Sequence, residues 1–276
     1  MSAAFDAERF AALAAPLRFG RPLVVKAVTG STNDDALEAA RAGAPEGALF
    51  VTEAQERGRG RRGNVWHASP GEALLFSLVL RPSLAVERAP VLALVAGLAV
   101  RAALAVTLKS ADVASEPRVK WPNDVVVGHK KVAGILVESQ VRGETLGAVV
   151  VGVGLNVGRS ELPAEVAAHA TSLAALGATV SREVLLAGIL RALEERLPLV
   201  PPLDALTGSR ELPLTTLMVE ELIAFDALRG AKVSVGDLKG VATGLDTRGN
   251  LRLLDANGAA HEVTSGHVIV ESWGAT

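Results

Sequence analysis

Four arginines and three glycines lie within twelve residues of this 276-residue chain, in the stretch QERGRGRRGNVW from Gln55 to Trp66. Guanidinium groups bind phosphate or carboxylate through paired hydrogen bonds. Glycines let the backbone approach a ligand closely and let a loop move. One interpretation is therefore a mobile loop that becomes ordered over a small anion such as a nucleotide.

Three other interpretations fit the same composition: a dinucleotide-binding loop, a nucleic-acid-binding arm and a solvated surface loop. Gly58, Gly60 and Gly63 have the GxGxxG spacing, but residues 64–71 predict no helix whose N-terminus could hold a pyrophosphate. A net charge of -2 and a pI of about 6.2 disfavour nucleic-acid binding. No GxxxxGK[ST] pattern is present, so a P-loop is excluded. The surface-loop interpretation stays open on composition alone.

The second stretch with chemical potential is KWPNDVVVGHKKVAGILVES, residues 120–139. Asn123 and Asp124 follow a proline bend between apolar strands, where polar groups need partners. Lys131 begins a strand in which Gly134 allows close approach, so its ammonium could offset charge developing on a phosphoryl group. Asp124 could hold a metal ion or a lysine nucleophile. The competing interpretation is a turn with capping Asn and Asp and exposed lysines.

Two shorter stretches carry weaker signals. GVGLNVG, residues 152–158, suggests close approach of a ligand, with Asn156 near a metal-bound phosphate, although a β-bulge explains the glycines equally well. Ser31 is predicted to cap a helix, with Asp34 completing a capping box and Gly43 ending the helix. Hydroxyl groups at such a helix start could also bind a neutral polar group of a ligand.

The elements that must position these residues follow from hydrophobic periodicity. Helices are predicted over residues 4–15, 31–43, 87–108 and 181–197. Strands are predicted over residues 21–28, 47–55 and 72–82 and in an antiparallel meander over residues 118–158. Five short strands after residue 228 predict a small β-barrel. The sequence thus predicts an α+β fold with one domain over residues 1–228 and a second over residues 229–276.

Bulk properties exclude several classes of protein. There are no cysteines, which removes disulfides and thiolate metal sites and fits a reducing cytoplasm. The five histidines show no metal-ligand spacing, and we interpret them as structural or surface residues. Charged residues interrupt the N-terminal apolar pattern, so no signal peptide is expected. Arg101 breaks the longest apolar run, which favours a buried helix over a membrane span.

Taken together, the motifs resemble those of biotin–protein ligases, and their order and separations fit across residues 24–157. The matching residues are Ser31-Thr32-Asn33, Gln55, Gly58 to Gly63 with Trp66, Lys120 to Asp124, Lys131-x-x-Gly134-Ile135-Leu136-x-Glu138 and Gly152-x-Gly154-x-Asn156. The resemblance implies a mixed or antiparallel sheet of the class II synthetase-like type and an SH3-like C-terminal barrel.

The resemblance also implies a two-step reaction. Biotin's carboxylate attacks the α-phosphate of ATP, giving biotinyl-5′-AMP and pyrophosphate. A lysine of a biotin carboxyl carrier domain then attacks the mixed anhydride. Mg²⁺ is expected to be held through the ATP phosphates, with no direct histidine or cysteine ligand.

Residue roles are carried over position by position. The biotin-binding set is Ser31, Thr32, Asn33, Gln55, Gly58, Arg59, Lys131, Gly134 and Gly152. The nucleotide-binding set is Arg61, Arg62, Trp66, Asn123, Leu155 and Asn156. The catalytic set is Lys131, Arg59, Arg61 and Asp124, where Asp124 helps to position the incoming lysine.

The sequence departs from the family pattern at two places. Many members have a basic residue two positions before the loop tryptophan, where it helps to cover the adenylate, and this chain has Asn64. About 23 residues precede the first predicted strand, too few for a helix-turn-helix domain, which predicts a ligase without specific DNA binding.

The rival predictions are a lipoate or octanoate ligase or transferase and, from another class, a nucleic-acid-binding regulatory protein. The acceptor and the oligomeric state are not specified. The resemblance is compatible with a homodimer that pairs at a sheet edge.

Overall fold

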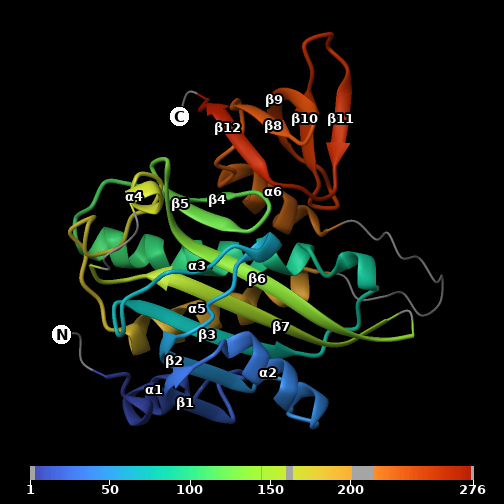
Figure 1. Cartoon of the computed structure of the whole chain (residues 1–276). Helices are drawn as coiled ribbons and strands as arrows, with labels where there is room; N and C mark the ends of the chain where they lie inside the picture. Colours follow the sequence, from blue (N-terminus) through green and yellow to red (C-terminus); the bar gives the residue numbers. More distant parts are fainter. Residues whose placement is uncertain (1–3, 144, 160–163, 201–213, 275–276) are drawn as a thin grey trace.

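Two β-sheets and the helices around them make up the protein, seen in a computed structural model that describes residues 4–143, 145–159, 164–200 and 214–274 (Figure 1). The larger sheet contains β1 (Leu23–Thr29), β2 (Leu49–Gln55), β3 (Ala73–Leu80), β4 (Pro117–Lys120), β5 (Asp124–Val127), β6 (Lys130–Arg142) and β7 (Thr145–Asn156). The smaller sheet contains β8 (Lys232–Val235), β9 (Leu238–Leu245), β10 (Leu251–Leu254), β11 (Ala260–Val263) and β12 (Val268–Ser272). The α-helices are α1 (Ala7–Ala14), α2 (Thr32–Arg41), α3 (Val91–Ser110), α4 (Ala164–Ala167), α5 (Arg182–Arg196) and α6 (Thr216–Ala224).

The larger sheet is mixed, with the strand order β1-β2-β3-β7-β6-β5-β4. β1 and β2 are parallel, and α2 forms the crossover between them. All other neighbours in this sheet are antiparallel, as the predicted meander requires. The observed architecture confirms the α+β class with a mixed sheet.

Helices cover the two faces of the larger sheet unequally. The main hydrophobic core lies between one face and the helices α3 and α5, while a smaller cluster lies under α2 on the other face. Strand alternation explains the division, because successive side chains point to opposite faces. On β7, Val151, Val153 and Leu155 join the main core, whereas Gly152 and Gly154 face the α2 side. On the α2 side, β7 therefore presents backbone without side chains, against which other parts of the chain pack closely.

Helix α3 is the buried helix that the sequence predicts. The stretch Val86–Ser110 is long and apolar enough to cross a membrane by length and composition, yet 72% of its most apolar window is buried inside the protein. Such burial is what the core helix of a soluble protein shows.

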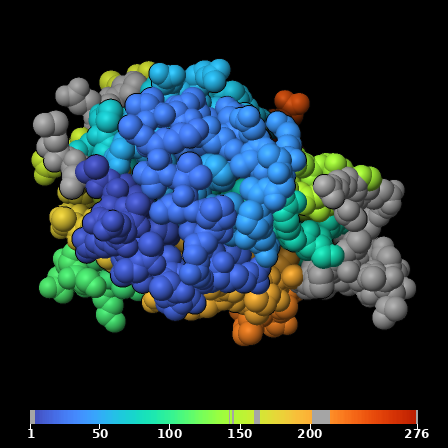
Figure 2. Space-filling model, turned by 90° about the horizontal axis from the view of Figure 1, so that it is seen from below, coloured from blue at the N-terminus to red at the C-terminus, as the bar shows by residue number. Residues whose placement is uncertain are grey.

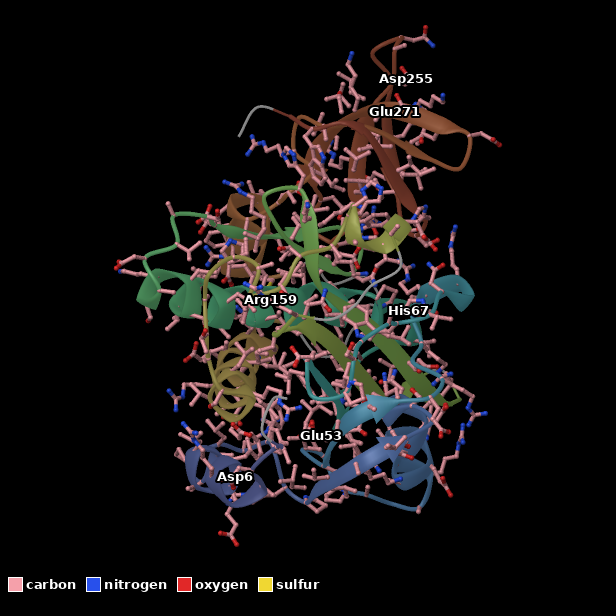
Figure 3. All side chains as sticks on the ribbon, turned by 60° about the vertical axis from the view of Figure 1, so that its left-hand side comes forward. Asp6, Glu53, His67, Arg159, Asp255 and Glu271 are labelled. Atoms are coloured by element: carbon pink, nitrogen blue, oxygen red, sulfur yellow. The ribbon has the colours of Figure 1, made fainter. Side chains whose placement is uncertain are left out.

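The smaller sheet is antiparallel, with the order β11-β10-β9-β8-β12, and its five strands fall where the sequence predicts them. It stands beyond β4, β5 and α6, at the end of the molecule opposite α1 and β1 (Figure 1). Figure 3 shows the same separation, with Asp255 and Glu271 at one end and Asp6 at the other. The indole Nε1 of Trp121 donates to the carbonyl of Gly249 over 3.0 Å, which ties the second motif to the smaller sheet.

The N-terminal elements form the opposite end of the molecule. In the space-filling view of Figure 2, the blue segments that contain α1, β1 and α2 cover most of this face. Side chains from elsewhere in the chain bind the backbone before α1, since Glu53 accepts from the Phe5 amide over 2.6 Å and Glu183 accepts from the Asp6 amide over 2.8 Å. Two helices were not predicted from the sequence, the short α4 and the nine-residue α6.

Candidate functional site

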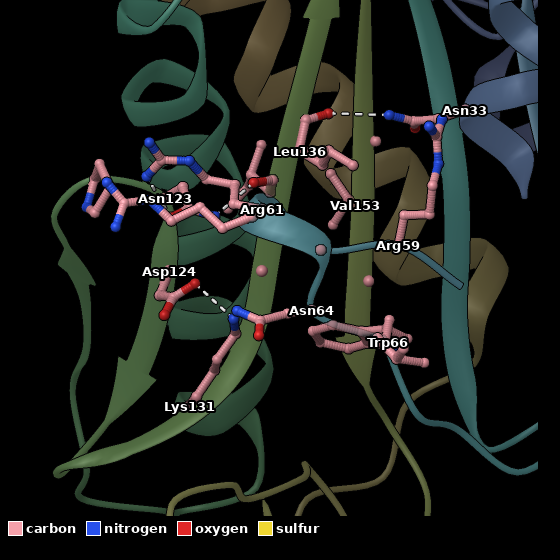
Figure 4. A pocket seen from close by; sticks show the side chains of 18 of the residues that line it. Asn33, Arg59, Arg61, Asn64, Trp66, Asn123, Asp124, Lys131, Leu136 and Val153 are labelled. Atoms are coloured by element: carbon pink, nitrogen blue, oxygen red, sulfur yellow. Dashed lines mark hydrogen bonds and ion pairs between the residues drawn. The ribbon is translucent and has the colours of Figure 1, made fainter. Parts of the chain in front are cut away.

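A cavity of about 180 Å³ opens on the α2 side of the larger sheet (Figure 4). Three separate regions of the sequence line it: the start of α2, the arginine loop from Gln55 to Trp66, and the facing segments of β5, β6 and β7. Residues 266–268 of the smaller sheet complete the wall. The fold thus brings together the stretches that the sequence singles out for chemistry.

The start of α2 is built differently from the predicted capping box. Ser31 occupies the N-cap position with extended backbone, but its side chain makes no capping hydrogen bond. Instead Oε1 of Gln55 accepts from the Thr32 amide over 2.8 Å and from the Thr32 hydroxyl over 3.1 Å. Asp34 pairs with Arg59 and does not complete a box. Ser31 is the N-cap residue as predicted, but the predicted capping box was wrong because a side chain from β2 satisfies the helix terminus, and Ser31 lines the cavity.

Asn33 is buried and fixed from both sides. Its Oδ1 accepts from the Ser77 hydroxyl over 2.6 Å, and its Nδ2 donates to Oε2 of Glu138 over 2.7 Å. A Cβ atom at Gly152 would overlap the Asn33 amide. The glycine at position 152 therefore makes room for the asparagine, which is a more specific role than close approach of the ligand alone.

The arginine loop folds back on itself over β6 and β7. The Trp66 amide donates to the Gly58 carbonyl over 3.0 Å, and a Cβ at Gly58 would lie 2.7 Å from the Trp66 carbonyl oxygen. Trp66 lies against Gly134 and Gly154, which are cross-strand partners. The glycines at these positions let the loop and its indole ring rest directly on the sheet.

Arg59 is held by two carboxylates. Its Nη2 lies 2.7 Å from Oδ1 of Asp34 on α2 and 2.9 Å from Oε2 of Glu138 on β6. The side chain is 38% exposed. This arrangement differs from the expectation that Arg59 points at a ligand anion.

Arg61 crosses to the other side of the cavity, where its Nη1 donates to Oδ1 of Asn123 over 3.3 Å. Nδ2 of Asn123 donates to the Ile135 carbonyl over 2.7 Å, which fixes the amide orientation. Burial, and next the adjacent Arg62, lower the pKa of Arg61, while Asp124 raises it. A guanidinium group keeps its charge through such a shift, so Arg61 remains a cation at the cavity.

Lys131 and Asp124 form an ion pair of 2.6 Å across β5 and β6 (Figure 4). The Lys131 ammonium also lies 5.6 Å from the centre of the Trp66 ring. Lys120 lines the same cavity, and burial followed by repulsion from Lys131 lowers its pKa, with Asp124 opposing the shift. Two lysines and one carboxylate therefore share this wall, as the second motif predicts.

Two residues of the predicted nucleotide set lie elsewhere. Leu155 is fully buried in the core against α3, because its place in the strand alternation directs it to the opposite face from Gly154. The structure thus does not bring its side chain to the cavity. Asn156 is 5% exposed at the end of β7, and its Nδ2 donates to the Thr171 carbonyl over 3.0 Å. Its Oδ1 is buried and has no hydrogen-bond partner among the described residues.

Sequence reasoning missed three side chains at the site. Ser77 is fully buried, and its hydroxyl donates to Oδ1 of Asn33 over 2.6 Å and lies 2.8 Å from the Thr32 hydroxyl. A lone serine within the apolar strand LLFSLVL is the signal that could have found it. Glu138 belongs to the family motif, but the sequence predicts no role for it. His267 is exposed, as its interpretation as a surface residue predicts, but it also lines the cavity from the segment that precedes β12. No sequence spacing indicated His267, because it depends on how the two sheets meet.

A second cavity, of about 600 Å³, adjoins the first beneath the smaller sheet. Arg61 and Asn123 line both cavities, and the start of α3 lies on the far wall of the second. The site therefore has space on both sides of the Arg61–Asn123 hydrogen bond, so that it can hold more than one ligand.

Comparison with known proteins gives one consistent family. Residues 25–156 match the model of the biotin/lipoate A/B protein ligase family. The bifunctional ligase/repressor BirA of Bacillus subtilis is 32% identical over 252 residues, covering 90% of this chain and 74% of that protein. The biotin--[acetyl-CoA-carboxylase] ligase of Mycobacterium tuberculosis is 36% identical over 256 residues, covering 90% of this chain and 89% of that protein.

A solved structure agrees with these relatives. The biotin protein ligase of Aquifex aeolicus in complex with biotin and ATP superposes with a TM-score of 0.70 at 26% sequence identity, covering 91% of this chain and 99% of that one. Fold, motif order and sequence identity thus point the same way, and this chain belongs to the biotin/lipoate A/B protein ligase family, on the branch of the biotin protein ligases.

Proposed function

We propose that this protein is an ATP-dependent biotin–protein ligase that forms biotinyl-5′-AMP and then transfers biotin to a lysine of a biotin carboxyl carrier domain. The observation that carries the proposal is one cavity lined by a neutral polar network at one end and by cations at the other. Biotin has the same two ends, an uncharged ureido ring and a carboxylate. The relatives named as biotin ligases support the same assignment.

The polar network suits the ureido ring. Ser31 offers a hydroxyl, while Thr32, Gln55 and Asn33 are already held in position by mutual hydrogen bonds or by Ser77. Groups fixed in advance lose little conformational entropy when the ligand binds. The dithiolane ring of lipoate or the alkyl chain of octanoate would offer no hydrogen bond to Ser31 or to the remaining donor and acceptor positions of this network, which disfavours both acids.

The cationic end suits adenylation. Two anions, the biotin carboxylate and the α-phosphate, must meet there, and the pentacovalent phosphorus gathers negative charge as pyrophosphate leaves. Lys131 and Arg61 provide positive charge from opposite sides of the cavity. We propose that Lys131 stabilises the developing charge and that Arg61, with Arg62, holds the phosphates.

The nucleotide needs further contacts, and we propose that Trp66 packs beside it while Asn123 and Asn156 hydrogen-bond to it or its metal ion. The buried, unpartnered Oδ1 of Asn156 supports this role, because such a group calls for a partner. Within the described ranges no three His, Asp or Glu side chains cluster as a metal cage. Mg²⁺ would therefore enter on the ATP phosphates, where it neutralises charge on the leaving pyrophosphate.

The second step is the attack of the carrier lysine on the mixed anhydride, with AMP as the leaving group. We propose that Asp124 orients this lysine. Its carboxylate is paired with Lys131. When Lys131 turns toward the adenylate, the Asp124 carboxylate becomes free to accept a hydrogen bond from the carrier lysine. The carrier is of the biotin carboxyl carrier type, as the name of the Mycobacterium tuberculosis relative suggests.

The finer structural and cellular assignments are also proposals. We propose that residues 1–228 act as the catalytic unit and that residues 229–276 form an SH3-like unit, supported by the five short antiparallel strands after α6. A cytoplasmic location and a ligase without specific DNA binding remain predictions, as does a homodimer. Promoter-binding and sedimentation measurements would test the last two.

The decisive experiment is biotin-dependent exchange of pyrophosphate into ATP. Exchange is expected with biotin and not with lipoate or octanoate. Equal or greater exchange with either of those acids would replace the proposal with its lipoate-ligase rival. Absence of exchange with all three acids would contradict the proposal that this protein is a ligase of any of them.

Lys131→Gln tests the assignment of charge. The substitution keeps a hydrogen-bonding side chain of similar length but removes the positive charge. The expected loss in the rate of adenylation is about 100- to 1000-fold, the range of a preorganised oxyanion contact. Lys130→Gln, at an exposed neighbouring position, is the matched control and should retain the full rate.

A further inference from the structure

We propose that Arg59 is a clasp for the arginine loop and that Asp34 is its positioning partner, together keeping the loop over the cavity and the adenylate bound. This inference rests on the proposed function for the identity of the retained ligand. It changes the role expected of Arg59 from gripping the ligand to holding the loop. The clasp is defined as Arg59 with Asp34 and Glu138.

The contacts connect three elements at one atom. Nη2 of Arg59 lies 2.7 Å from Asp34 on α2 and 2.9 Å from Glu138 on β6. Glu138 in turn accepts from Asn33, so the loop is joined to the polar network that lines the cavity. Arg59 is thus the point where the loop attaches to the rest of the site.

Charge balance argues against Arg59 as the main anion ligand. Two carboxylates already face one guanidinium group, so the cluster carries a net charge of about -1 when all three groups are ionised. A ligand carboxylate approaching it would meet net repulsion. Lys131 faces one carboxylate, and Arg61 donates its hydrogen bond to the oxygen of a neutral amide. Lys131 and Arg61 are therefore better placed than Arg59 to bind the anionic atoms of the ligand.

Fixing Arg59 also fixes the far arm of the loop. Arg59 and Val65 form an antiparallel bridge, and the Trp66 amide donates to the Gly58 carbonyl. The two arms therefore move together. Loosening the clasp should lift both Arg59 and the Trp66 ring from β6 and β7.

Asp34 is the part of the clasp that can be changed without damaging the cavity. Its side chain is 49% exposed, whereas Glu138 also positions Asn33. The neighbouring Asp35 provides a matched control in the same first turn of α2. Asp35 pairs with Lys26 over 3.0 Å and accepts from the Thr29 hydroxyl over 2.8 Å, both on β1 and away from the loop. The Asp34→Asn and Asp35→Asn variants lose equal charge at the helix N-terminus.

Trypsin provides a test that needs no enzymatic activity, because the loop contains Arg57, Arg59, Arg61 and Arg62. Native full-length protein is digested briefly and the cleavage sites are identified by mass spectrometry. Asp34→Asn should raise the rate of cleavage within the loop about two- to fivefold, the scale of a half-exposed ion pair. Asp34→Glu keeps the carboxylate, so its loop should be cleaved as slowly as the loop of the wild type. An unchanged rate in Asp34→Asn, or an equal rise in Asp35→Asn, overturns the clasp.

Retention of the adenylate is measured on the same variants. Protein loaded with biotin and MgATP is diluted into excess unlabelled biotin, and the rate of release of labelled biotinyl-AMP is followed. Asp34→Asn should release it about two- to fivefold faster with an unchanged KM for biotin in pyrophosphate exchange, and rising salt should narrow the difference. Equal release rates in the variant and the wild type overturn the retention role. If the wild type forms no adenylate, the proposed function is wrong. The trypsin result still tests whether Arg59 and Asp34 hold the loop.

Discussion

Single residues at this site owe their roles to the partners that the fold gives them. Lys131 and Arg59 are both cations of the same cavity, yet one faces a single carboxylate and the other faces two. From this difference in local charge we infer the two proposed roles, ligand stabilisation for Lys131 and loop attachment for Arg59. Residue type alone does not separate these tasks.

Asn64 offers a test at this scale. It is exposed and lines the cavity at the position where many members of the family have a basic residue. Asn64→Arg adds a charged donor to the wall and should slow the release of biotinyl-AMP about tenfold, as expected for a hydrogen bond to a charged group. Release is measured by isotope chase, with Asn64→Gln as the uncharged control. A release rate as slow in the wild type as in Asn64→Arg would show that this chain retains its adenylate without the basic residue.

Glycines position the site where one element of the fold packs against another. Strand β7 has Gly152 beneath Asn33 and Gly154 beneath Trp66, so the start of α2 and the arginine loop both rest on the same strand. Alternation along β7 sends the intervening Val153 to the core. The strand thus serves the core on one face and the ligand site on the other.

Gly152→Ala tests this arrangement. The added Cβ atom would overlap the Asn33 amide and displace it from Ser77 and Glu138. Biotin binding, measured by calorimetry, should weaken about tenfold or more, because buried polar groups lose their partners. Gly188→Ala in α5 is the control, since its Cβ would meet Ala103 at an ordinary 3.6 Å. Unchanged affinity in Gly152→Ala would mean that Asn33 is not part of the biotin site.

At the scale of the whole molecule, a buried carboxylate lies where the two sheets join. Asp226 bridges to Val119 of β4 and is 4% exposed. Its Oδ1 accepts from the Leu228 amide over 2.8 Å, while its Oδ2 is buried with no hydrogen-bond partner in the described part of the chain. Burial raises the pKa of Asp226 from 3.8 to about 6, against the lowering effect of the Leu228 amide.

This shift predicts a pH dependence of the free energy of unfolding. The folded protein binds the Asp226 proton more tightly than the unfolded chain, so this group's contribution to stability is greatest below pH 4 and falls as the pH rises to about 6. Asp226→Asn keeps the acceptor for Leu228 without a charge, and it should be more stable than the wild type at pH 7 by up to about 3 kcal/mol. Urea unfolding between pH 4 and 8 measures the difference, with the exposed Asp237→Asn as control. A difference that is the same at every pH would contradict the assignment.

Much of this architecture is predictable from the sequence, because local rules govern it. Periodicity and turn residues indicate the helices, the meander and the five C-terminal strands, and α3 is buried as its composition requires. The predicted capping box of α2 was wrong because the side chain of Gln55, 23 residues from Thr32, replaces the local cap. Helix α6 was missed because no strong periodic pattern marks its nine residues.

What the sequence determined by itself is the chemistry: a glycine-rich arginine loop, a lysine–aspartate hairpin and a glycine-rich strand end, in the order of a biotin–protein ligase. Only the tertiary structure decided which charges meet. Arg59 and Glu138 are 79 residues apart, and their pairing depends on how the loop crosses β6 and β7. Leu155 faces the core because of strand alternation, and His267 lines the cavity because of how the two sheets meet. Strand alternation and sheet order fix the direction of a side chain, and neither property is contained in a motif.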